Sequence, residues 1–112
     1  MAKVIGIISL KGGVGKTSVV ANLGTALAQE FAKKVLIVDA NFSTPHLGIH
    51  VGLINPEFSL HNVLNNEVSP YQAIYQHNLV FHIIPGALSP KPVNPLNLKE
   101  KIDVLKENYD VI

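Results

Sequence analysis

The apolar positions of this chain follow two patterns that change at a glycine cluster. Residues 3–10 form a nearly continuous apolar run, which is typical of a strand buried on both faces of a parallel sheet. Residues 16–31 carry apolar side chains three or four positions apart, which predicts an amphipathic helix. Its expected apolar stripe comprises Val19 or Val20, Leu23, Leu27 and Phe31. We expect Lys33 and Lys34 to close this helix, because positive charge suits its carbonyl end.

A second apolar run, residues 34–39, predicts another buried strand. Strand, glycine loop, helix and strand then form a βαβ unit, whose right-handed crossover makes the two strands parallel. The sequence therefore predicts an α/β fold in which a parallel β-sheet is flanked by helices.

Shorter elements separated by proline and glycine follow. A short helix is expected after Ser59, and another begins at Ser69 with a capping box; we place Tyr71 and Tyr75 on the second helix. Residues 79–84 predict a third strand. A proline-rich loop then leads to a helix opened by Asn94 and Pro95, with one face made by Leu98, Ile102 and Leu105.

Residues 109–112 have the pattern of the first residues of a fourth strand. We therefore interpret residues 1–112 as the amino-terminal part of a single domain that is incomplete, and as a fragment of a longer protein.

The glycine cluster has the composition of a phosphate-binding loop. Glycine reaches the backbone angles that curl successive amides around a phosphate, and the following helix presents its positive end. Lys16 stands where an ammonium group reaches the outer phosphates, Thr17 where a hydroxyl ligates Mg²⁺, and Ser18 where a hydroxyl donates to an inner phosphate. The predicted nucleotide site comprises Lys11, Gly12, Gly13, Val14, Gly15, Lys16, Thr17 and Ser18.

This loop departs from the common phosphate-loop pattern, since Leu10 occupies the first glycine position. Lys-Gly-Gly-x-Gly-Lys-Thr instead resembles the deviant Walker A motif of the ParA/MinD family of P-loop ATPases. Residues 35–41 resemble the second strand of that family, which usually ends in Asp-x-Asp. Residues 71–75 and 83–86 resemble the family's segments before and at its third strand. Residues 109–112 resemble the approach to Walker B and the switch II aspartate, which would lie beyond Ile112.

The resemblance implies a Mg²⁺-dependent ATPase that binds ATP and ADP and forms a nucleotide-dependent homodimer. Lys11 would be the signature lysine that reaches the partner subunit's phosphates, the role of an arginine finger elsewhere, and the chain contains no arginine. Lys16 would neutralise the β- and γ-phosphates. Asp39 matches the first acid of Asp-x-Asp, near Mg²⁺ and the attacking water. The resemblance thus implies Lys11, Lys16 and Asp39 as catalytic residues, and Thr17 and Asp39 at the metal.

Asn41 departs from the family pattern, which usually has an aspartate that orients the attacking water. Asparagine can hydrogen-bond water but cannot act as a base. We therefore expect competent ATP binding, weak hydrolysis without a partner, and poor hydrolysis by residues 1–112 alone.

Composition narrows the possible partners. A net charge of +1 provides no broad field for nucleic acid or an acidic membrane. The absence of cysteine excludes a disulfide, a thiolate metal site or a cysteine nucleophile within this chain.

The first apolar run is too short for a signal peptide or a membrane span, and we expect a cytoplasmic protein. His46 and His50 are spaced for a shared metal, but Pro45 and Gly48 interrupt the stretch, and we expect no transition-metal site.

The leading hypothesis is a ParA/MinD-like ATPase that places the cell-division site or partitions chromosomes or plasmids. It would respond to an activator protein and would contact a membrane or DNA only through regions not in this chain. One alternative is a metal-cluster carrier ATPase similar to Mrp or nitrogenase iron protein, whose cysteines would lie beyond Ile112. The other is a non-hydrolysing nucleotide-binding regulatory module.

Overall fold

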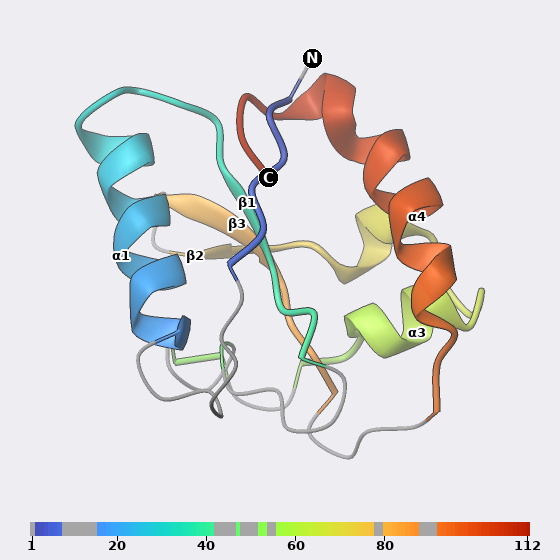
Figure 1. Ribbon diagram of the computed structural model, residues 1–112. Coiled ribbons are helices and arrows are strands. Elements are labelled where there is room, and N and C mark those ends of the chain that lie inside the picture. Colours follow the sequence, from blue (N-terminus) through green and yellow to red (C-terminus); the bar gives the residue numbers. More distant parts are fainter. Residues whose placement is uncertain are drawn as a thin grey trace.

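A computed structural model shows a β-sheet that lies between helices (Figure 1). The structure describes residues 2–7, 16–41, 47, 52–53, 56–77, 80–87 and 92–112. For Lys16, Thr17 and His77 it describes the main chain only.

A three-stranded sheet in the order β1–β3–β2 forms the middle layer (Figure 1). β1 (Leu36–Val38) and β3 (Phe81–Ile84) are parallel, as the prediction of a parallel sheet requires. β2 (Tyr75–His77) pairs antiparallel with β3, so the sheet is mixed rather than purely parallel. This outer strand was not predicted from the sequence.

On the other side of β1, two isolated bridges extend the sheet. Val111 is level with both Lys3 and Val35 and runs parallel to each. The predicted start of a fourth strand is therefore confirmed, and it lies between the amino-terminal segment and β1. Of the strand expected at residues 3–10, Lys3 makes the bridge, and residues 8–10 lie outside the described part of the chain.

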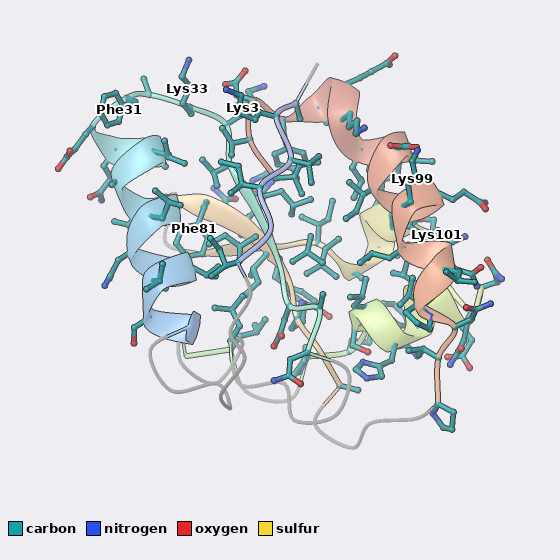
Figure 2. The ribbon with its side chains drawn as sticks, viewed as in Figure 1. Lys3, Phe31, Lys33, Phe81, Lys99 and Lys101 are labelled. Atoms are coloured by element: carbon teal, nitrogen blue, oxygen red, sulfur yellow. The ribbon has the colours of Figure 1, made fainter. Side chains whose placement is uncertain are left out.

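One face of the sheet is covered by α1 (Lys16–Gln29). Val20 and Leu27 pack against a buried cluster that includes Ile37 and Phe81, and Figure 2 shows Phe81 beside this helix, on the side of the strands. Val19 is 51% exposed, so Val20 is the residue that the core uses. The predicted helix is therefore confirmed, and of its expected apolar stripe Val20 and Leu27 pack on the core while Leu23 is 39% exposed.

The end of α1 differs from the prediction. Lys33 and Lys34 lie beyond the helix, and Phe31 is 62% exposed. Ala32 adopts a left-handed φ of 52°, and the Lys33 amide donates to the Leu27 carbonyl at 3.0 Å. This is the main-chain pattern of a Schellman stop, so backbone geometry closes the helix rather than lysine side chains.

The opposite face is covered by α3 (Leu60–Leu64) and α4 (Leu98–Leu105), both at predicted places. A short 3₁₀ turn, η2 (Pro95–Asn97), leads into α4, and η3 (Lys106–Asn108) follows it. The second core cluster fills the space between these helices and the sheet; its buried members include Leu36, Leu60, Leu64, Ile84 and Leu105.

The capping box at Ser69 opens only a single 3₁₀ turn, η1 (Pro70–Ala73). The amide of Ser69 donates to Gln72 Oε1 at 2.9 Å, as the motif requires. The chain then becomes extended at Ile74, so Tyr75 belongs to β2. The prediction that Tyr71 and Tyr75 share one helix is therefore wrong.

Candidate nucleotide-binding site

The predicted phosphate loop falls only partly within the described residues. Its residues Lys11, Gly12, Gly13, Val14 and Gly15 lie outside them. Lys16 and Thr17 form the first two positions of α1, and Ser18 follows with a partly buried side chain. The structure therefore shows where the helix after the loop begins. The roles of the loop residues and of Lys16, Thr17 and Ser18 in binding phosphate stay a prediction.

α1 begins at the edge of the sheet where β1 ends, the lower edge in Figure 1. Amino ends of helices carry partial positive charge and unpaired amides, which favour an anion. The first turn of α1 contains no acidic residue that would offset this charge. An anion-binding helix terminus and the carboxyl end of a parallel strand thus share one edge, as the βαβ unit predicts.

Asp39 occupies this edge and is 6% exposed. Its amide donates to the Ile84 carbonyl at 3.0 Å, which joins the ends of β1 and β3. Its Oδ1 accepts the Asn41 amide and its Oδ2 accepts the Leu47 amide, both at 3.1 Å. The carboxylate therefore organises the loop after β1.

Asn41 lies two residues further, partly buried at the same edge. Its main-chain amide donates a hydrogen bond to Asp39 Oδ1. The two residues of the predicted Asp-x-Asn segment are thus brought together, beside the end of β3.

His61 is a residue at this edge that sequence reasoning missed. It lies on α3, is 2% exposed, and its Nδ1 accepts the Ala87 amide at 3.0 Å. The neighbouring Leu60 amide donates to the Pro85 carbonyl at 2.7 Å. α3 therefore fixes the chain that follows β3. No local signal predicts this, because the bonded residues are 26 positions apart.

The other four histidines lie in different parts of the chain. His46 and His50 lie outside the described residues, and only the main chain of His77 is described. His82 Nδ1 contacts the Tyr109 hydroxyl at 2.7 Å. Within the described residues, no three histidine or acidic side chains gather in a way that could hold a metal ion.

A family model for an AAA domain matches residues 2–112. Over 117 residues the chain is 34% identical to the septum site-determining protein MinD of Thermotoga maritima, covering all of this chain and 43% of that protein. The chain belongs to the MinD/ParA family of P-loop ATPases. It spans less than half the length of this relative.

Solved structures of MinD proteins have the same fold. The cell division ATPase MinD of Pyrococcus furiosus superposes with a TM-score of 0.91 at 37% identity, over 100% of this chain and 48% of that one. MinD of Pyrococcus horikoshii, solved with Mg-ADP, gives 0.91 at 38%, over 100% and 47%. MinD of Aquifex aeolicus, solved in complex with MinC, gives 0.83 at 33%, over 99% and 46%.

These family members bind magnesium nucleotide in one structure and a protein partner in another. Among the described helices of this chain, none is long and apolar enough to cross a membrane.

Proposed function

We propose that this chain is the phosphate-binding part of a MinD/ParA-like ATPase that binds ATP and ADP with Mg²⁺ and dimerises when nucleotide is bound. One observation carries the proposal. The Lys-Gly-Gly-x-Gly-Lys-Thr run leads directly into α1, whose amino end lies at the edge of the sheet that holds Asp39. The MinD structure with Mg-ADP supports the choice of ligand.

The roles of the loop residues follow from their chemistry. Amides of Gly12, Gly13, Val14 and Gly15 would cradle the phosphates, where a side chain at the glycine positions would obstruct oxygen. Lys16 would neutralise the outer phosphates, Thr17 would ligate Mg²⁺, and Ser18 would bind an inner phosphate.

Lys11 would act across the dimer interface, on the phosphates bound by the partner subunit. A cation at the transferring phosphate stabilises the charge that develops there. The chain has no arginine, so a lysine is the side chain that it can offer for this task.

Asp39 would hold a water near Mg²⁺, because a carboxylate oxygen accepts hydrogen bonds from water and the side chain lies at the edge of the sheet where α1 begins. Asn41 would orient the attacking water without removing its proton, so hydrolysis would be slow until a partner activates it.

The biological role proposed here is positioning of the cell-division site or partition of chromosomes or plasmids, in the cytoplasm and with an activator protein. The names of the MinD relatives support division-site placement. A metal-cluster carrier would need cysteines, and this sequence has none. A non-hydrolysing regulatory module would keep the same binding site and differ only in turnover.

Calorimetric titration of the chain with Mg-ADP and Mg-ATP tests the binding step. Lys16→Ala should weaken binding about tenfold or more, the equivalent of about 1.4 kcal/mol. Lys33→Ala is the matched control, because Lys33 lies beyond the far end of α1 (Figure 2) and should leave affinity unchanged. Equal losses in both variants, or no nucleotide binding by the unaltered chain, would contradict the proposal.

A further inference from the structure

His61 is a buried polar side chain to which the proposed nucleotide chemistry assigns no role. It is 2% exposed, and it is one of three buried polar or charged residues in the part of the chain that the structure describes, together with Asp39 and Ser59. Removing an imidazole from water costs free energy unless its nitrogens form hydrogen bonds. On α3 the Ala87 amide provides such a partner, at the edge of the sheet that also holds Asp39.

The hydrogen bond between His61 and Ala87 determines which ring nitrogen carries a proton. A main-chain amide can only donate, so Nδ1, at 3.0 Å from the Ala87 nitrogen, is the acceptor. Nδ1 therefore has no proton, and the ring is the neutral tautomer with hydrogen on Nε2. The contact thus requires an acceptor at one particular position of the side chain.

α3 is anchored independently of this contact. Leu60, Val63 and Leu64 are at most 2% exposed, and they belong to the core cluster that also includes residues of β1 and β3. Just before the helix, the Phe58 amide donates to the Tyr75 hydroxyl of β2 at 2.9 Å. Because α3 is fixed by burial and by this bond, loss of the contact with Ala87 would release the chain after β3 rather than the helix.

Residues 84–87 are held between the end of β1 and α3 by three hydrogen bonds. The Ile84 carbonyl accepts the Asp39 amide at 3.0 Å. The carbonyl of the next residue accepts the first amide of α3 at 2.7 Å. The bond between His61 and Ala87 is the third, and it fixes the far end of the segment. The main chain of Asp39 is therefore attached to a segment whose other end His61 holds.

We propose that His61 is a positioning residue for the nucleotide site, which places Asp39 by holding residues 84–87 against α3. The inference rests on the proposed function, because Asp39 is the side chain expected near Mg²⁺. His61 acts without touching the nucleotide, through the Ala87 amide and the main-chain bond between Ile84 and Asp39. Residues that orient a group at a metal site typically change metal affinity or activity about 10- to 100-fold when they are removed.

Two carboxamide substitutions separate the acceptor position from the other properties of the side chain. The oxygen of asparagine lies two bonds from Cβ, as Nδ1 of histidine does, whereas that of glutamine lies three bonds away, as Nε2 does. His61→Asn therefore keeps an acceptor for Ala87, and His61→Gln moves it away. Glutamine favours a helix more than asparagine does, so a general effect on helix stability would act in the opposite direction.

Calorimetric titration of the full-length protein with ADP, once with Mg²⁺ and once with a chelator, tests the inference. In His61→Gln the gain in ADP affinity that Mg²⁺ provides should fall about tenfold, because Asp39 is misplaced. Affinity in the chelator should stay unchanged, since the phosphate loop leads into α1, on the other face of the sheet from α3 (Figure 1). His61→Asn should match the wild type in both titrations.

NMR provides two further measurements on the same proteins. The imidazole nitrogen shifts of wild-type His61 should report the tautomer with hydrogen on Nε2, a result that needs no variant. The Ala87 amide should exchange faster in His61→Gln and at the wild-type rate in His61→Asn.

A proton on Nδ1 of wild-type His61 would overturn the inference, as would equal effects of His61→Asn and His61→Gln on Mg²⁺-dependent affinity. An equal loss of ADP affinity in His61→Gln with and without Mg²⁺ would also overturn it, because that loss would not involve the metal. Absence of ADP binding by the wild type would contradict the proposed function, and this inference with it. The two failures are therefore distinguishable.

Discussion

The carboxylate of Asp39 holds the main-chain amide of Leu47, eight residues further along the chain, through a buried hydrogen bond of 3.1 Å. The other oxygen of the same carboxylate holds the Asn41 amide. One side chain therefore shapes the loop at the edge of the sheet where the nucleotide site is proposed.

Replacing Asp39 should destabilise the fold as well as the site. Asp39→Ala leaves two main-chain amides without these acceptors, and each buried unsatisfied donor costs about 1–3 kcal/mol. Asp39→Asn should cost less, because one carboxamide oxygen remains. Urea unfolding measures both values. Asp103→Ala is the matched control, since Asp103 is exposed on α4 and pairs with Lys99 and Lys106 of the same helical segment. Equal effects of Asp39→Ala and Asp103→Ala would contradict the assigned role of Asp39.

Asn41→Asp should raise ATP turnover by the full-length protein, because a carboxylate can both orient water and accept its proton. An effect on the order of a hundredfold is expected from general base catalysis. Steady-state phosphate release measures the rate. Asn22→Asp is the control, since Asn22 is exposed on α1 and receives the same change in charge. Equal, fast rates in the wild type and in Asn41→Asp would refute the weak-hydrolysis hypothesis.

Gly24 allows α1 to pack closely on β1. A Cβ at this position would lie 2.6 Å from Ile37 Cδ1 and 3.6 Å from Phe81 Cδ2. Gly24→Ala should therefore cost about 1 kcal/mol of unfolding free energy, since overpacking outweighs the gain in helix propensity.

Ile37→Val provides the test of that cause, because it removes the crowded methyl group. Alone it should cost about 0.5–1.5 kcal/mol. Combined with Gly24→Ala, the total should be smaller than the sum of the two, since the residues are in contact. Additive costs in a double-mutant cycle would show that the close approach to Ile37 is not the source.

Tyr109 should make stability fall at alkaline pH. Burial raises the pKa of the Tyr109 hydroxyl above its usual value, and the nearby Tyr71 adds to this shift. The folded state thus disfavours the phenolate. The stabilisation is complete below the unfolded pKa of about 10 and is lost as pH rises through the raised folded pKa.

Tyr109→Phe should flatten that alkaline decline. It also removes the contact with His82 Nδ1, which should cost about 1 kcal/mol near neutral pH. Urea midpoints between about pH 8 and 11 measure both effects. An alkaline decline of the same steepness in both proteins would assign the titration to another group.

The pattern of apolar residues predicted those helices and strands whose buried face is determined by their own side chains. Leu36, Ile37 and Val38 form an uninterrupted apolar run, and they form β1. The spacing of Val20 and Leu27 likewise predicted the buried face of α1. In both cases the periodicity of the side chains is enough to determine which face is covered.

Other features depend on partners that are distant in the sequence. β2 contains Gln76 and His77, which carry no strand signal, and it forms because β3 offers an unpaired edge. The contacts of Asp39 with Leu47 and of His61 with Ala87 join loops that have no periodic pattern. Val4 and Ile5 were expected to be buried, and instead they are exposed and line an apolar pocket beside β1.

The stop beyond α1 differs from an electrostatic cap in one respect. It is made by the left-handed φ of Ala32 and by the main-chain bond from the Lys33 amide to the Leu27 carbonyl. Added salt screens interactions between exposed charges, but it has little effect on a main-chain hydrogen bond. The length of α1 should therefore be the same at low and at high ionic strength.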